Sequence, residues 1–240
     1  MKTLGIIGGI GPESTIEYYR RINALYRQRL PGGGAPSIII NSIDNGKLLA
    51  FAAANELAEL ATYLTAEVAK LARGGAAFAL LAANTPHLVF ESVAQRSPIP
   101  LISIVEATVR SAKTRGLKRL GLLGTRFTMQ SSFYREALSG QQIELVVPNE
   151  EEQAYVHDKY MQELLKGIIL PETRERLMAI IKALKDRSLI DGVILGGTEL
   201  SLILRDEIVF GVQVLDTTQI HVEAAVAQLI SKSSYGAPHK

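Results

Sequence analysis

The chain has 240 residues, of which 47% are apolar and only 6% aromatic, and its 26 lysines and arginines nearly balance 24 acidic residues. A net charge of +2 with both signs interspersed argues against a nucleic-acid or acidic-membrane surface, and no segment approaches the roughly 20 apolar residues that cross a bilayer. The absence of cysteine excludes disulfides and thiolate metal sites, and the four histidines show no metal-like spacing. The composition therefore predicts a cytoplasmic protein that holds no metal and contacts neither nucleic acid nor membrane.

Apolar runs of strand length alternate with segments of helical periodicity along the chain, which is typical of parallel α/β units. The opening residues are too short and too rich in glycine for a secretory core, so they are interpreted as a buried strand. Strands are predicted near 3–8, 36–42, 76–83, 100–103, 119–124, 142–146, 191–196 and 212–215. Helices are predicted near 12–29, 56–73, 87–95, 104–115, 129–138, 151–166, 171–187 and 217–231.

The chain also repeats itself once, since Leu4–Gly9 resembles Leu120–Thr125 and each is a strand running into a loop. Two facing copies of one unit would form a cleft from equivalent loops. The predicted fold is therefore α/β with two similar domains, each a parallel sheet flanked by helices, related by a pseudo-two-fold axis with the site between them. With a crossover near Pro98–Pro100 and a return after about residue 210, the first domain is expected at 1–100 plus 210–240 and the second at 101–209.

The loop Gly8–Thr15 lies between the first predicted strand and helix. Its glycines allow close backbone approach to a ligand, and amides at a helix start favour anions. A dinucleotide fingerprint fits poorly, because Ser14 stands where the third glycine belongs and Pro12 removes an amide proton. A carboxylate-binding loop that includes Gly9 and Ile10 is favoured, with a purely structural turn as the alternative.

Two buried strands end in short polar motifs, Asn84–Thr85 after the third strand and Thr198–Glu199 after the seventh. Free amides at the following helix start, together with hydroxyl and amide side chains, can hold a carboxylate. Helix capping alone is the alternative for both threonines. Glu199 either pairs with an α-ammonium group or complements the helix dipole.

Four further side chains have both a possible functional role and a structural explanation. Thr125 and Thr128 could bind the second carboxylate of a dicarboxylate or cap a helix. Lys166 could contribute a cation to the substrate or complement a helix end. His87 is interpreted as a structural, hydrogen-bonded histidine rather than a proton shuttle.

Together these motifs resemble the aspartate/glutamate racemase family, and most of all its bacterial branch specific for L-aspartate or L-glutamate. The residues that carry the resemblance are Gly5–Gly9, Glu13–Thr15, Tyr18–Arg20, Ile22–Asn23, Ser42–Asp44, Asn84–Thr85, His87, Leu123–Arg126, Thr128–Met129, Phe133–Arg135, Gly196, Thr198–Glu199, Asp216–Thr218 and Ile220–His221. The resemblance implies two α/β domains, a cofactor-independent site at their interface for an amino acid or dicarboxylate, and a homodimer.

In that family the two strand-end motifs read Cys-Asn-Thr and Gly-Cys-Thr-Glu, with the thiols facing each other across the substrate. One branch carries threonine at the first position. Here Ala83 and Gly197 stand at the two proton-transfer positions. Removal of an α-proton without a cofactor depends on placed groups of suitable pKa, so the resemblance predicts an impaired or inactive racemase.

Three functions stay open at this point. The first is a racemase framework without its thiols that still binds its ligand. The second is an enzyme of the same fold that uses Thr85, Thr198, Glu199 or His87 for different chemistry. The third possibility is a non-catalytic protein that binds amino acids, dicarboxylates or another protein.

Overall fold

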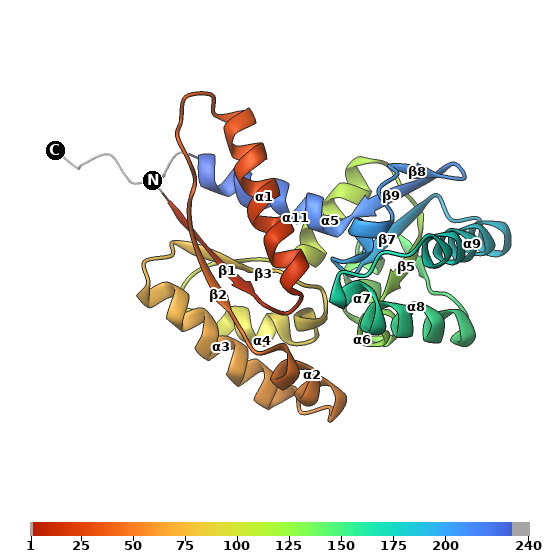
Figure 1. Cartoon of the computed structure of the whole chain (residues 1–240), viewed down its shortest axis with the longest axis horizontal. Helices are drawn as coiled ribbons and strands as arrows, with labels where there is room; N and C mark the ends of the chain where they lie inside the picture. The colour runs from red at the N-terminus through yellow and green to blue at the C-terminus, as the bar shows by residue number, and fades with distance from the viewer. Residues whose placement is uncertain (1, 232–240) are drawn as a thin grey trace.

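The computed structural model describes residues 2–231, which form two sheets side by side with helices around each (Figure 1). The four-stranded sheet has the order β2-β1-β3-β4 and the five-stranded sheet the order β6-β5-β7-β9-β8. All pairs are parallel except the β8–β9 hairpin. The strands are β1 (Thr3–Gly8), β2 (Ser37–Ser42), β3 (Phe78–Leu81), β4 (Leu101–Ile102), β5 (Arg119–Gly124), β6 (Glu144–Val146), β7 (Gly192–Gly196), β8 (Ile208–Val209) and β9 (Val212–Asp216).

The two sheets share one topology, because each places its second strand first, followed by its first, third and fourth parallel strands. Among the strands of residues 2–231, only the β8 edge strand has no counterpart in the other sheet. The expectation of an α/β fold with parallel sheets flanked by helices is confirmed. The shared strand order also agrees with the repeat seen between residues 4–9 and 120–125.

Helices cover both faces of each sheet, as the buried strands require. The helices of the first half are α1 (Pro12–Arg29), α2 (Asn45–Ala53), α3 (Leu57–Arg73), the 3-10 helix η1 (Thr85–Val89) and α4 (Phe90–Arg96). The remaining helices are α5 (Ile104–Thr114), α6 (Arg126–Gln130), α7 (Phe133–Ser139), α8 (Glu150–Gln162), η2 (Leu164–Lys166), α9 (Pro171–Ser188), α10 (Leu200–Ile203) and α11 (Thr217–Ile230). In the part of the chain described, no helix is long and apolar enough to cross a membrane.

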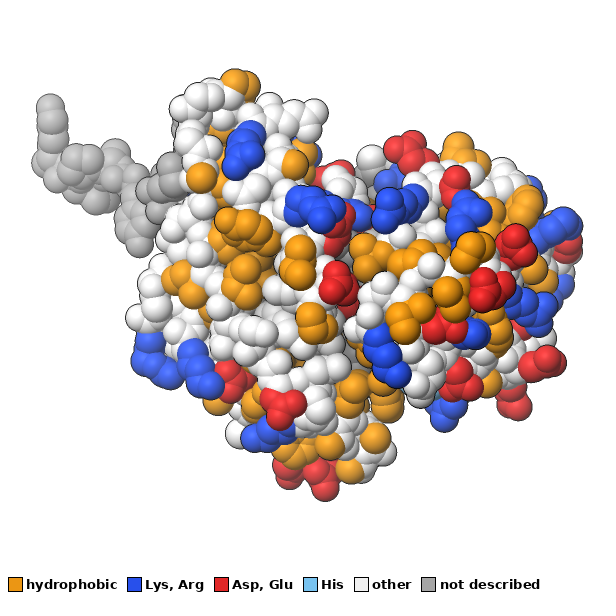
Figure 2. Space-filling view, viewed as in Figure 1, with side chains coloured by type: hydrophobic (Ala, Val, Ile, Leu, Met, Phe, Trp, Pro, Cys, Tyr) orange, Lys and Arg blue, Asp and Glu red, His pale blue; other side chains and the backbone are white. Residues whose placement is uncertain are grey.

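Alternate residues of β3 belong to two different cores. Phe78 and Leu80 pack with α1 and α11 on one face of the first sheet, whereas Ala79 and Leu81 pack with α3 on the other. A separate, larger cluster forms the core of the second half. On the face of the molecule shown in Figure 2, positive and negative side chains are interspersed, as they are along the sequence.

The predicted partition of the chain needs correction at both ends of the second domain. β4 lies inside the expected second domain but pairs with β3 in the first sheet. β9 lies inside the expected first domain but pairs with β7 in the second sheet, and only α11 returns to pack on the first core. A strand buried on both faces carries no periodicity that selects its sheet, and the chain between β7 and β9 contains only the short elements α10 and β8. Residues 232–240 lie outside the described part.

Short helices account for most other differences from the sequence-based expectation. α2 and α10 were not predicted, and the helix expected at 129–138 is divided into α6 and α7. α2 begins because the Asp44 side chain accepts a hydrogen bond from the Gly46 amide at 2.9 Å. A capped helix of nine residues is too short for its apolar periodicity to be distinguished from a loop.

Candidate active site

Four strand ends place the predicted site residues, two from each half. β1 and β3 of the first sheet and β5 and β7 of the second end in the loops before α1, η1, α6 and α10. These ends surround a cavity of about 20 Å³. It is lined by Ile10, Gly11, Asn45, Leu49, Ala83, Asn84, Thr85, Thr125, Tyr160, Met161, Leu165, Gly196, Gly197, Thr198 and Glu199. The structure thus brings eight of the expected positions together: Ile10, Ala83, Asn84, Thr85, Thr125, Gly197, Thr198 and Glu199.

Three expected residues do not line this cavity. Gly9 forms the turn itself, with φ +80°, and a Cβ there would lie 2.6 Å from the Ile43 carbonyl oxygen. Thr128 lies behind Thr125, with their hydroxyl oxygens 3.1 Å apart. Lys166 bonds Gln162 on the exposed surface, away from the site.

Ala83 and Gly197, the two positions at which the resemblance leads us to expect proton transfer, line the same cavity from opposite halves of the molecule. Ala83 is buried and follows β3. Gly197 follows β7, and the space that its Cβ would need is filled by the ring of Tyr160, whose Cε2 would lie 2.4 Å away. Neither position carries an ionisable atom, and the second has no room for a side chain.

The Glu199 carboxylate is fully engaged in a buried cluster of hydroxyl groups. Ser14 Oγ donates to its Oε1 at 2.6 Å, and Thr198 Oγ1 donates to its Oε2 at 2.9 Å. The Tyr160 hydroxyl also donates to Oε2. We call Ser14, Tyr160, Thr198 and Glu199 the Glu199 cluster. Within residues 2–231 no lysine or arginine pairs with this carboxylate.

Burial raises the pKa of the Tyr160 phenol well above its usual value, and the adjacent Glu199 charge raises it further. Tyr160 therefore stays protonated at neutral pH and acts as a hydrogen-bond donor. It holds Glu199 in place and is a poor base for proton abstraction.

Asn84 is held by both halves of the molecule. Its Oδ1 accepts from the Tyr134 hydroxyl at 2.7 Å, and its Nδ2 donates to Thr217 Oγ1 at 3.1 Å. Beside it, the hydroxyl oxygens of Thr85 and Thr125 lie 3.3 Å apart across the junction. These side chains form the polar wall of the cavity, and hydroxyl and amide groups of this kind can bind a carboxylate.

His87 lies behind Ala83 and is neutral, since burial lowers its pKa to about 3. Its Nε2 accepts from the Ile104 amide at 3.2 Å, so its Nδ1 carries the proton and donates to the Ala83 carbonyl oxygen at 3.1 Å. These contacts give His87 a positioning role for the strand end.

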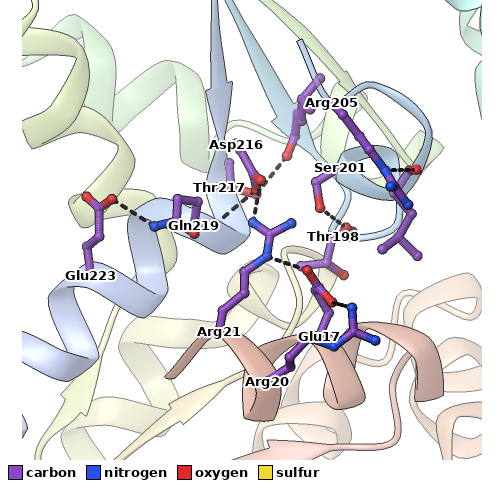
Figure 3. Close-up of polar contacts among 12 residues, drawn as sticks. Glu17, Arg20, Arg21, Thr198, Ser201, Arg205, Asp216, Thr217, Gln219 and Glu223 are labelled. Carbon is purple, nitrogen blue, oxygen red and sulfur yellow. Dashed lines mark hydrogen bonds and ion pairs between the residues drawn. The ribbon is translucent and has the colours of Figure 1, made fainter. Parts of the chain in front are cut away.

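A larger groove of about 880 Å³ lies on the other side of the Glu199 cluster, between α1, α11 and the β8–β9 hairpin. Figure 3 shows Arg21 of α1 pointing between Glu17 and Asp216. Its Nε bonds Glu17 and its Nη1 bonds Asp216, both at 2.6 Å. Among the predicted site residues, none lines this groove, and its ion pairs join α1 to the start of α11.

Sequence reasoning missed Tyr160, Ser14, Asn45 and Leu49. Tyr160 has the helical spacing of a core residue, and nothing in its neighbourhood connects it to Gly197. Ser14 entered the sequence analysis as a departure from a dinucleotide fingerprint and as part of the resemblance, but not as a site residue. Asn45 and Leu49 belong to α2, which was not predicted.

The model of the Asp/Glu/hydantoin racemase family matches residues 7–225. The chain belongs to this family. The resemblance drawn from the sequence motifs is thereby confirmed.

Individual relatives agree with this assignment. The broad specificity amino-acid racemase RacX of Bacillus subtilis (strain 168) is 24% identical, over 96% of this chain and all of that protein. A candidate Asp/Glu racemase from Yersinia pestis has a similar structure, with a TM-score of 0.86 and 34% identity over 96% of this chain and 100% of its own. An aspartate racemase homologue from Pyrococcus horikoshii OT3 has a TM-score of 0.81 and 34% identity, over 95% of this chain and 99% of its own.

Proposed function

We propose that this family member retains a cofactor-independent amino-acid site but exchanges the α-proton between two faces weakly or not at all. The observation that carries the proposal is that Ala83 and Gly197 line one cavity while neither has an ionisable atom. Racemisation requires a base on one face of Cα and a proton donor on the other. Both positions are vacant here.

The neighbouring side chains are poor replacements for the missing base and proton donor. The Thr85, Thr125 and Thr198 hydroxyls are aliphatic alcohols, which are weak bases without an activating partner. The Tyr160 phenol is protonated and bonded to Glu199, and the Glu199 carboxylate already accepts three hydrogen bonds. Proton transfer also tolerates little misplacement, since about 1 Å can cost on the order of a hundredfold in rate.

A second candidate function is a non-catalytic protein that binds amino acids or dicarboxylates. It is favoured by the survival of the polar wall, Asn84, Thr85 and Thr125, where the proton-transfer groups have gone. The two candidate functions share their ligand class and differ in whether the protein still exchanges the α-proton of its ligand. The proposal also includes a cytoplasmic location, which the composition predicts, and a homodimer, which the family resemblance implies.

Two measurements on the unmodified protein test the proposal. Calorimetry should detect binding of aspartate, glutamate or malate, with dissociation constants in the millimolar to micromolar range that is usual for small substrates. Proton NMR in D₂O should detect little or no deuterium uptake at Cα of either enantiomer of aspartate or glutamate. Rapid uptake would overturn the loss of racemisation, and the absence of binding to all of these ligands would overturn the retained site and favour an interaction protein.

A further inference from the structure

We propose that Tyr160 closes the amino-acid site from the side of the missing second thiol, and that a ligand enters only when its ring leaves the cavity. We further infer that an α-amino acid opens the site more readily than a dicarboxylate without an amino group. Both inferences rest on the proposed function and identify what controls access to the same site.

The ring and a ligand compete for one volume. An ideal Cβ on Gly197 would lie 2.4, 3.0 and 3.2 Å from three carbons of the Tyr160 ring. The ring therefore fills the space that a side chain at position 197 would occupy. The cavity that remains, about 20 Å³, is of the size of a single water molecule. Aspartate does not fit unless the Tyr160 ring moves.

Hydrogen bonds hold the ring in this position. The Tyr160 hydroxyl donates to Glu199, and the same carboxylate accepts from Ser14 Oγ at 2.6 Å. Ser14 belongs to α1 of the first half, whereas Tyr160 and Glu199 belong to the second. The Glu199 cluster therefore joins the two halves and keeps the site closed.

Gly11 leaves room for this cluster. Its backbone has φ −134°, which any residue can adopt. A Cβ at Gly11 would nevertheless lie 1.7 Å from Glu199 Oε1, so only glycine permits the carboxylate to reach Ser14. The closed arrangement thus depends on a glycine at position 11, on the first half of the molecule, as well as on the residues of the second half.

The ligand preference follows from the charge of Glu199. When the Tyr160 hydroxyl leaves, the buried carboxylate loses a hydrogen-bond donor, which is costly unless it is replaced. An α-ammonium group replaces the donor and adds an opposite charge. Succinate offers no donor and brings a second negative charge toward Glu199, so we expect it to bind at least tenfold more weakly than L-aspartate.

Thiol labelling provides a test of closure that needs no ligand, because the chain has no cysteine. Ala83→Cys introduces a single thiol into the cavity wall. We expect a small thiol reagent to label Ala83→Cys/Tyr160→Ala at least tenfold faster than Ala83→Cys alone. Tyr155→Ala in the same background is the matched control, because Tyr155 lies on the same helix, near Lys159 and Arg176, and does not line the cavity.

Tyr160→Phe is the conservative variant, since it keeps the ring and removes only the bond to Glu199. We expect its labelling rate to lie between those of the parent and of Tyr160→Ala. Thermal melting of each variant separates local opening from global unfolding. Equal labelling rates for the parent and both Tyr160 variants, with unchanged melting, would overturn closure by Tyr160.

Calorimetry then tests the ligand class. Tyr160→Ala should bind L-aspartate at least tenfold more tightly than the unmodified protein. Tyr155→Ala should bind it with the affinity of the unmodified protein. Equal affinity of Tyr160→Ala for succinate and L-aspartate would overturn the amino-acid preference. Faster labelling without binding of any amino acid would leave closure standing and count against the proposed function alone.

Discussion

At the scale of single residues, Gly197 and Tyr160 form a coupled pair. A side chain at 197 and the ring at 160 need the same space, and the φ angle of Gly197 lies outside the left-handed region. Crowding by the ring, and not backbone strain, therefore requires glycine here. A cysteine at 197 would for the same reason need a smaller residue at 160.

We expect Gly197→Ala to destabilise the protein by about 1 to 3 kcal/mol, the usual cost of overpacking a buried site. Combined with Tyr160→Leu, the same change should cost less than it does alone, because the crowded ring is gone. Urea unfolding of the four proteins in this double-mutant cycle measures the coupling.

Gly140→Ala is the matched control for that cycle. Gly140 ends α7 with φ −60°, and a Cβ there would meet its nearest neighbours at 3.8 Å. Alanine should therefore be neutral or slightly stabilising at this position. If Gly197→Ala is as stable as Gly140→Ala, the Tyr160 ring moves aside without lowering the free energy of unfolding, which would contradict the prediction.

At the scale of elements, β2 forms one edge of the first sheet, and half of its residues are exposed. In the described part of the chain it pairs only with β1. Its sequence from Ser37 to Ser42 contains no charge and no proline, the features that usually protect an edge. An antiparallel copy of the strand would pair Ile39 with Ile40 and Ser37 with Ser42, so the edge is nearly self-complementary.

We therefore expect the proposed homodimer to form through β2, giving one continuous eight-stranded sheet. Ile40 is 39% exposed on this strand, and Ile40→Lys should lower the mass measured by light scattering from dimer to monomer. Ile208→Lys is the matched control on the edge strand of the other sheet, where isoleucine is 64% exposed. Dissociation by Ile208→Lys instead would assign the interface to β8.

At the scale of the whole molecule, two buried histidines hold the segment that crosses between the halves. His221 Nε2 donates to the Ile102 carbonyl oxygen at 3.0 Å and its Nδ1 accepts from the Tyr18 hydroxyl at 2.9 Å. His87 accepts from the Ile104 amide on the other side of the crossover. Both rings are neutral, because burial lowers the pKa of His221 to about 4 and that of His87 to about 3.

These low pKa values predict loss of stability in mild acid. The unfolded chain takes up protons below about pH 6.5 while the folded protein does not, so stability is full above that pH and falls as the pH decreases toward 4. The two histidines together account for up to about 5 kcal/mol between pH 6.5 and 4.5. Melting temperatures measured across this range should fall steeply.

Neutral replacements identify the histidines as the cause. His221→Gln and His87→Gln should each be less stable at pH 7.5, since they lose buried hydrogen bonds, but should show a shallower decline between pH 6.5 and 4.5. Carboxylates with lowered pKa values, such as Glu152, act mainly below that range. An unchanged slope in both variants would contradict the assignment.

The sequence by itself determined the repeating units and the polar strand ends. β1 and α1 have the bounds that were predicted, 3–8 and 12–29, because strand and helix periodicities are local properties. Asn84, Thr85, Thr198 and Glu199 were singled out because they follow buried strands, and the strand ends of two facing parallel sheets line one cavity. The sequence alone also showed that neither Ala83 nor Gly197 carries an ionisable side chain.

Only the tertiary structure decided which residues and strands lie beside these positions. Tyr160 fills the place beside Gly197, Ser14 reaches Glu199 across the two halves, and β9 joins the second sheet. Each of these depends on contacts between residues far apart in the chain, whereas periodicity reports only which side of an element is buried. Burial of Tyr160 could be predicted, but its neighbour could not, because any core position satisfies the same pattern.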